Sequence, residues 1–242
     1  GIAGFLDTAP ARSGPDPAGI IARMTDTLEH RGPDGGGAWF APDNAIAPRH
    51  RRLAILDLSP AGDQPMVSHS GCCVLSFNGE IYNYGEIRHA LEAAGHRIAW
   101  RGSSDTEVML EALERFGVER ALAQFNGMFA FALWDGGKES LFLARDRAGK
   151  KPLFFCRRPD GGLIFASELK ALRLHPEVSE EIDPKAVSDF LSHNYIPNDR
   201  CILKGVEKLP AAHYLVLAQD IPNPQPVEYW DLASRFHDKA HY

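Results

Sequence analysis

The sequence MFAFALWDGGKESLFLA, residues 128–144, has the pattern of a β-hairpin. Two apolar runs within it flank Asp135-Gly136-Gly137-Lys138, whose residue types favour a tight turn. A similar turn at residues 159–162 separates two further apolar runs. Because hairpins join antiparallel strands, we expect mainly antiparallel sheets. The predicted strands of the two hairpins are residues 128–134, 140–144, 153–155 and 163–166.

Helices are predicted where apolar residues recur with helical spacing. One runs from Asp16-Pro17 through Leu28, because an acidic cap and a first-turn proline suit the free N–H groups of a helix start. Another runs from about Tyr84 to Gly95, and a third from the capping pattern Ser104-Asp105-Thr106-Glu107 to Gly117. Clustered strands with helices at the start and middle favour an α+β fold over βαβ repeats. Further predictions are strands at residues 51–56 and 72–77, a helix near 184–192 and a hairpin-like stretch near 209–217.

The composition excludes several classes of function. The 242 residues are 44% hydrophobic and 24% charged, which is ordinary for a globular chain with a sizeable core. The net charge of -6 is spread without basic runs, which argues against a nucleic acid or an anionic membrane as partner. Four cysteines lack metal-ligand spacing, and we interpret them as buried free thiols. Without a targeting segment or an apolar run of about 18 residues, the sequence favours a cytoplasmic protein.

Three segments place polar residues beside turn residues at predicted strand ends: His30-Arg31-Gly32-Pro33-Asp34-Gly35, residues 52–57 and residues 77–83. Each has an ordinary structural explanation. Gly-Pro-Asp-Gly favours a turn, and Asn78-Gly79 favours a hairpin turn. Asp105, at a predicted helix start, can be a simple cap. Taken singly, these segments therefore do not establish a function.

Taken together and in order, they resemble the class II glutamine amidotransferase domain of glutamine-hydrolysing asparagine synthetases. The resemblance covers almost the whole chain. It implies the N-terminal-nucleophile hydrolase fold, a four-layer αββα sandwich of two mainly antiparallel sheets. It also implies hydrolysis of L-glutamine to glutamate and ammonia, which would supply ATP-dependent asparagine synthesis from aspartate. The matching motifs begin at Gly1, His30, Arg52, Asn78 and Ser104, with further matches from Asn126, Arg145 and Phe165.

The chemistry of glutamine hydrolysis suits these residue types. Amide hydrolysis passes through an oxyanion that needs hydrogen-bond donors, and the Asn78 amide and the Gly79 N–H could supply them. The Arg52 guanidinium could bind the substrate carboxylate, and Asp105 and Glu80 could bind its ammonium. The resemblance implies the same roles. It also implies that the backbone of Leu53, Ala54, Ile55 and Leu56 lines the pocket and that Arg31 and Asp34 order the surroundings of the nucleophile.

The nucleophile that the resemblance implies lies outside the numbered sequence. Members of the family begin Cys-Gly-Ile-Ala-Gly, so a cysteine is expected immediately before Gly1, with its own α-amine as base. Gly1 has no side chain. Cys72 and Cys73 lie in a predicted strand without a free amine, so we interpret them as core thiols.

Two alternatives remain open. One is a catalytically inactive amidotransferase-like scaffold, as in β-lactam synthetases or another asparagine-synthetase-like enzyme; the presence of Arg52, Asn78, Glu80 and Asp105 favours a working glutamine pocket instead. The other is a sugar-phosphate or phosphoribosyl amidotransferase, which typically carries a different loop at residues 30–34.

Residues 1–190 are expected to form the amidotransferase domain, and residues 191–242 an extension toward a synthetase domain. The sequence reaches Tyr242 without a Gly-rich phosphate-binding loop, so we expect it to be part of a longer protein. No cofactor or metal is expected in the amidotransferase domain, whereas ATP and magnesium would act in the synthetase domain. The expected partners are L-glutamine, the synthetase domain and a second copy in a homodimer.

Overall fold

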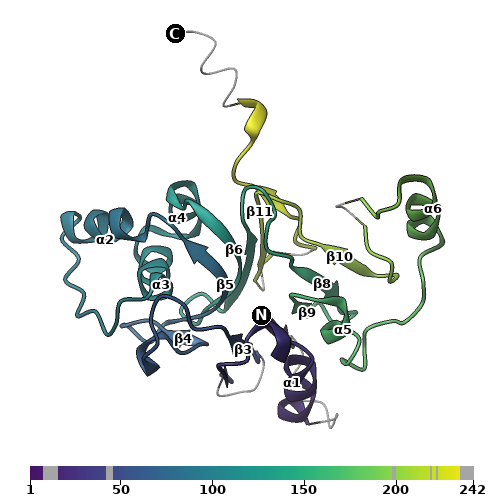
Figure 1. The fold of residues 1–242 in the computed structure, drawn as a ribbon, viewed down its shortest axis with the longest axis horizontal. Coiled ribbons are helices and arrows are strands. Elements are labelled where there is room, and N and C mark those ends of the chain that lie inside the picture. Colours follow the sequence, from purple (N-terminus) through teal and green to yellow (C-terminus); the bar gives the residue numbers. More distant parts are fainter. Residues whose placement is uncertain (8–15, 42–45, 198–199, 219, 222, 235–242) are drawn as a thin grey trace.

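The structure, a computed structural model, contains two antiparallel sheets that lie against each other (Figure 1). It describes residues 1–7, 16–41, 46–197, 200–218, 220–221 and 223–234. Within these residues, the first sheet has the order β10 (Val206–Lys208), β8 (Phe154–Arg157), β9 (Leu163–Ala166), β1 (Ile2–Leu6), β3 (Arg49–Arg52) and β2 (Gly35–Ala38). The second has the order β12 (Val227–Glu228), β11 (His213–Leu217), β7 (Ser140–Arg145), β6 (Gly127–Asp135), β5 (Cys73–Ile81) and β4 (Met66–Val67).

Apolar side chains fill three layers between the sheets and the helices. The inner faces of the sheets meet around buried residues such as Leu143 and Phe165. The helices α1 (Pro17–Asp26) and α5 (Leu169–Leu172) cover the outer face of the first sheet. The outer face of the second sheet is covered by α2 (Tyr84–Ala93), α3 (Asp105–Phe116) and α4 (Val118–Gln124) (Figure 1). This order of helix, sheet, sheet and helix confirms the predicted α+β, four-layer αββα fold.

The helices begin and end where the sequence predicts. The Asp16 carboxylate accepts hydrogen bonds from the Ala18 and Gly19 N–H groups at the start of α1. The Ser104 hydroxyl accepts one from the Glu107 N–H at the start of α3 (3.3 Å). After α3, Gly117 has a φ of 81°, a conformation that favours glycine. The predicted helix near residues 184–192 is also confirmed, as α6 (Pro184–His193).

The predicted strand at residues 51–56 is wrong beyond Arg52. Arg52 pairs with Gly35, the first residue of β2, and β1 pairs with β3 only at His50 and Arg49. No strand among the described residues therefore lies beside residues 53–56 to continue the ladder. Their apolar side chains are largely exposed, with Leu53 at 55% and Ile55 at 67%.

Three further predictions are corrected. Asn78-Gly79 forms no hairpin turn but continues β5, opposite Ala130 and Phe129 of β6. The hairpin-like stretch near residues 209–217 is not a hairpin, because β10 pairs with β8 in one sheet and β11 with β7 in the other. Cys72 precedes β5 and is exposed, whereas the other three cysteines are buried free thiols as predicted.

The segment expected to form a C-terminal extension, residues 191–242, contributes β10, β11 and β12 to the two sheets. Residues 198–199, 219, 222 and 235–242 of that segment lie outside the described residues. The domain boundary near residue 190 stays a prediction. None of the described helices has the length and apolar character that a membrane crossing requires.

Candidate active site

A cavity of about 370 Å³ lies where β3, β5 and the start of α3 meet Gly1. Segments far apart in the sequence line it, because the two sheets bring the ends of β3 and β1 close to the edge of β5. The cavity gathers all of the predicted site residues, namely Arg52, Leu53, Ala54, Ile55, Leu56, Asn78, Gly79, Glu80 and Asp105.

The edge of β5 forms one wall of this pocket because β4 covers only part of it. Met66 and Val67 of β4 pair with Leu75 and Val74. Beyond these residues, side chains instead of a strand accept hydrogen bonds from the N–H groups of β5. The Phe77 N–H donates to Gln64 Oε1 (2.6 Å), and the Ile81 N–H donates to Asp105 Oδ2 (2.8 Å). Because alternate residues of a strand direct their N–H groups to the same edge, the Gly79 N–H lies between these two and also faces the open edge.

Asn78 provides a second donor in the pocket. Its Nδ2 is buried and has no hydrogen-bond partner among the described residues. A buried amide without a partner is costly, and a ligand in the cavity that Asn78 lines could supply the missing acceptor. Gly79 is required by close packing, because a Cβ there would lie 2.1 Å from the Met128 carbonyl oxygen of β6. Asn78 and Gly79 therefore offer two adjacent donors to an oxyanion.

Arg52 is held in place by the loop that follows it. Its Nη1 donates to Asp63 Oδ1 (2.6 Å) and to the Ser59 carbonyl (3.1 Å), and its Nη2 donates to the Asp57 carbonyl. Gly62 lets the guanidinium lie against this loop, since a Cβ there would be 2.3 Å from Nη2. Among the described residues no hydrogen bond engages its Nε. Arg52 also lines the cavity, where a guanidinium could bind a carboxylate.

Asp105 is the acidic group on the α3 side of the pocket. It is the first residue of α3 and is only 5% exposed. Burial raises the pKa of its carboxyl, and the charge of Glu80 adds to the rise, while hydrogen bonds from backbone N–H groups oppose it. A cation bound beside Asp105 and Glu80 would relieve this unfavourable charge.

Asp57 is a site residue whose role the sequence did not reveal, although it ends the motif that begins at Arg52. Its Oδ1 accepts from the Ser59 N–H (2.8 Å) and hydroxyl (2.6 Å), and its Oδ2 accepts from the Ser103 N–H (2.9 Å). The Ser59 hydroxyl and these backbone donors lower the pKa of Asp57 to about 2. Asp57 thus ties the loop after β3 to the turn before α3.

The start of β1 lies in the pocket as well. The Gly1 nitrogen donates to the Arg51 carbonyl (2.8 Å), and the Ile2 N–H donates to the Ser167 hydroxyl (3.0 Å). Arg31 packs beside Gly1, with its Cδ 3.2 Å from the position a Gly1 Cβ would take, and pairs with Glu168 (2.8 Å). A residue joined to Gly1 would therefore begin inside the pocket.

Asp34 acts on the loop rather than on the pocket directly, since its Oδ2 accepts from the Ala54 N–H (2.9 Å). The expected roles of Arg31 and Asp34 stay predictions. Gln64, His50 and Lys151 also line the cavity, and sequence reasoning did not select them. Across the described residues, no group of three or more His, Cys, Asp and Glu side chains is placed to hold a metal ion.

Two facing antiparallel sheets with this pocket at the first strand define an amidotransferase-type fold. The solved glutamine phosphoribosylpyrophosphate amidotransferase from B. subtilis, complexed with ADP and GMP, matches 95% of this chain and 49% of its own, with a TM-score of 0.67 and 16% sequence identity. The family model of the glutamine amidotransferase domain matches residues 1–230. The chain belongs to this family, as its motifs predict.

Relatives found by sequence similarity have names more specific than that of the family. Glutamine-hydrolysing asparagine synthetase 3 of Bacillus subtilis (strain 168) is 36% identical over 219 residues, which are 89% of this chain and 34% of the relative. A putative glutamine-hydrolysing asparagine synthetase of Mycobacterium tuberculosis (strain ATCC 25618 / H37Rv) is 35% identical over 95% of this chain and 37% of the relative. The chain spans about a third of the length of these relatives.

Proposed function

We propose that this chain is a glutaminase domain that hydrolyses L-glutamine to glutamate and ammonia. The observation that carries the proposal is the buried Asn78 Nδ2, which has no hydrogen-bond partner in the described part of the chain and lies in the same pocket as Arg52 and Asp105. A free amino acid has a carboxylate and an ammonium, and the pocket offers a guanidinium for the first and two carboxylates for the second. Asn78 and the Gly79 N–H would then stabilise the oxyanion that forms at the side-chain amide.

The proposed nucleophile is a cysteine immediately before Gly1. An N-terminal α-amine has a reference pKa of roughly 7.7–8.0 and can accept the thiol proton near neutral pH. The thiolate attacks the amide carbon of glutamine and forms a tetrahedral intermediate. The intermediate collapses when its nitrogen takes the proton back from the α-amine and leaves as ammonia. Water then hydrolyses the thioester to glutamate. The position of Gly1 supports this proposal, because Gly1 packs against Arg31 and lines the same cavity as Asn78.

The ammonia would serve asparagine synthesis from aspartate in an adjoining synthetase domain, where ATP and magnesium would act. The names of the relatives and the share of their length that this chain spans support this assignment. The proposed partners are therefore L-glutamine, that synthetase domain and a second copy of the chain. An inactive scaffold is the alternative, and measurements of binding and turnover distinguish the two.

Removal of either charged anchor is expected to weaken glutamine binding. Arg52→Ala and Asp105→Ala each remove one charge-assisted contact, which contributes about 1.5–3 kcal/mol. Such a loss raises the dissociation constant by roughly ten- to a hundredfold. Isothermal titration with L-glutamine measures the change. Arg88→Ala is the control, because Arg88 lies on α2, away from the cavity lining, and contacts Glu92 and the Trp100 ring at the surface. Unchanged affinity in both anchor variants would contradict the proposed substrate.

The pH dependence of glutamine binding is expected to follow the ionisation of Asp105. Since the pKa of this buried carboxyl is raised above its ordinary value of 3.8, it takes up a proton at a higher pH than an exposed aspartate does. The ammonium of glutamine favours the ionised form. Affinity should therefore be full above the raised pKa and should fall as the pH drops through it. Titration calorimetry at a series of pH values, with Asp105→Asn as control, tests this. An equal fall in Asp105→Asn would assign the effect to another group.

A further inference from the structure

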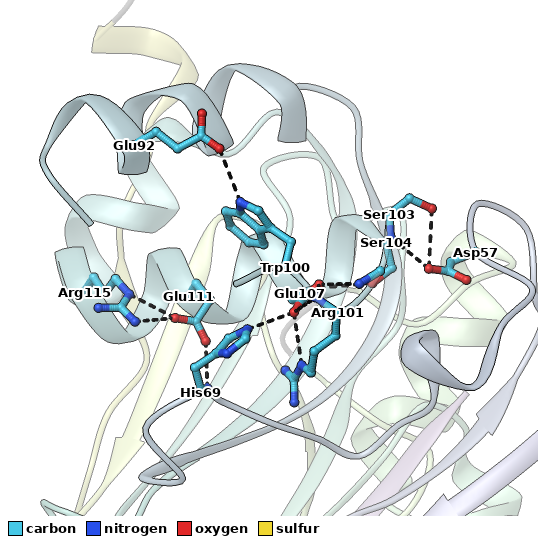
Figure 2. Close-up of polar contacts among 11 residues, drawn as sticks. Asp57, His69, Glu92, Trp100, Arg101, Ser103, Ser104, Glu107, Glu111 and Arg115 are labelled. Atoms are coloured by element: carbon cyan, nitrogen blue, oxygen red, sulfur yellow. Dashed lines mark hydrogen bonds and ion pairs between the residues drawn. The ribbon is translucent and has the colours of Figure 1, made fainter. Parts of the chain in front are cut away.

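Glu107 lies outside the pocket, in the first turn of α3, and its side chain is only 1% exposed. Its Oε1 accepts from the Arg101 N–H (3.0 Å) and from Arg101 Nε (3.0 Å), and lies 3.0 Å from His69 Nε2 (Figure 2). Its Oε2 accepts from the Gly102 N–H (3.1 Å). In a capping box this side chain would bond to the backbone of Ser104 instead. The Glu107 side chain therefore holds the turn that precedes α3 instead of completing a capping box.

The carboxylate of Glu107 is ionised in this setting. Burial alone would raise its pKa, but the hydrogen bonds from Arg101, His69 and Gly102 outweigh burial, and the pKa lies below its ordinary value. Hydrogen bonds to an ionised acceptor are stronger than neutral ones. The turn at residues 101–104 is thus fixed to α3 by a buried negative charge.

The turn at residues 101–104 also contacts the loop that holds Arg52. The Ser103 N–H donates to Asp57 Oδ2 (2.9 Å), as Figure 2 shows. Gly102 allows the contact, since a Cβ there would lie 2.5 Å from Asp57 Oδ2. Asp57 also presents its carbonyl to the Arg52 guanidinium. Glu107 therefore holds the backbone at Arg101 and Gly102, and the next residue, Ser103, is hydrogen-bonded to Asp57. Asp57 in turn accepts from Arg52, so hydrogen bonds and short stretches of backbone connect Glu107 to Arg52.

The same helix turn carries Asp105, two residues before Glu107. We infer that Glu107 is a positioning residue that sets the spacing between Arg52 and Asp105, the two groups that would hold the carboxylate and the ammonium of the substrate. The inference rests on the proposed function. It adds a residue that touches no substrate, yet determines whether both ends of one amino acid can be bound at once.

Glu107→Gln tests the inference, because it keeps the size of the side chain and removes its charge. The Michaelis constant and the dissociation constant for L-glutamine should rise about ten- to a hundredfold, as expected when an anchor is displaced. The value of kcat should change far less, since Asn78 and Gly79 stay on β5. Both constants are measured on the protein with a free cysteine before Gly1.

Glu111→Gln is the matched control. Glu111 lies one turn further along α3, is fully buried and accepts from the His69 N–H (2.9 Å) and from Arg115 (2.9 Å) (Figure 2). Among the described residues Glu111 has no hydrogen bond to the turn at residues 101–104, but it shares His69 with Glu107, so this variant also controls for a change at His69. We expect both variants to lower the midpoint of thermal unfolding, but only Glu107→Gln to raise the Michaelis constant. A purely structural role of Glu107 would give the two variants the same kinetics.

A double variant tests whether Glu107 and Asp57 act through the same set of contacts. Asp57→Asn should also raise the Michaelis constant, and its combination with Glu107→Gln should cost less than the sum of the two, because both act through one set of bonds. Additive effects, or a Michaelis constant in Glu107→Gln equal to that in Glu111→Gln, would overturn the inference alone. If the unsubstituted protein neither binds nor hydrolyses glutamine, the proposed function fails, and the inference fails with it.

Discussion

Asn78→Ala is expected to lower kcat for glutamine hydrolysis by about 10²–10³-fold while the Michaelis constant changes little. The Nδ2 of Asn78 is buried and has no hydrogen-bond partner among the described residues, so its removal breaks no hydrogen bond there. Its proposed partner is the oxyanion, which carries full charge only in the transition state and the intermediate. An interaction of that kind affects the chemical step rather than substrate binding. Steady-state kinetics on the protein with a free cysteine before Gly1 measures the effect.

Ser76→Ala is the control for this prediction. Ser76 lies two residues earlier on β5 and also has a buried side-chain oxygen with no hydrogen-bond partner in the described ranges, but it does not line the pocket. Its replacement should leave kcat unchanged. If Asn78→Ala instead raised the Michaelis constant and left kcat alone, Asn78 would be a binding residue. If Ser76→Ala lowered kcat equally, the effect would come from the packing of β5.

Local sequence signals predicted most of the architecture. The two hairpins and the three helix starts depend on residues within a few positions of each other, such as Asp16 with Gly19 and Ser104 with Glu107, and these contacts are present. The strand predicted at residues 51–56 failed beyond Arg52 for the opposite reason. A strand needs a neighbouring strand. Whether one lies beside Leu53 depends on where β2 begins, and the run of apolar residues contains no information about that position.

For the candidate site, too, the residue types could be predicted from the sequence, but the contacts that position them could not. The nine residues were predicted because their types would suit the two ends of glutamine and its oxyanion and because their order resembles a family, and the structure places all nine around one cavity. The contacts that position them join distant segments. Asp57 meets Ser103 across 46 residues, and Gln64 meets Phe77 through a side chain that no motif marks. Such contacts are products of the tertiary structure. Asn78-Gly79 shows how local preference can mislead, since the pair favours a turn but lies inside β5.

The N-terminus is expected to decide whether this domain turns over glutamine at all. A form in which cysteine is exposed directly before Gly1, with a free α-amine, should release ammonia from L-glutamine without added ATP or metal ion. Apart from the cysteine and its α-amine, the groups that the proposed chemistry needs line one pocket of this chain. It should make no asparagine, because the proposed synthesis belongs to another domain. The form that begins at Gly1 should bind glutamine or glutamate but release no ammonia above background, since Gly1 has no side chain to act as nucleophile.

A third form, extended by residues before the cysteine, separates the thiol from the amine. It keeps the sulfur in the chain but converts the α-amine to an amide, which is no longer a base, so its turnover should also be lost. Ammonia release and glutamine binding are measured on the three forms side by side. Activity in the form that begins at Gly1 would place the nucleophile elsewhere in the pocket. Full activity in the extended form would remove the α-amine from the mechanism. A cysteine form that is inactive and fails to bind glutamine would favour the scaffold, because Arg52 and Asp105 would then hold no substrate.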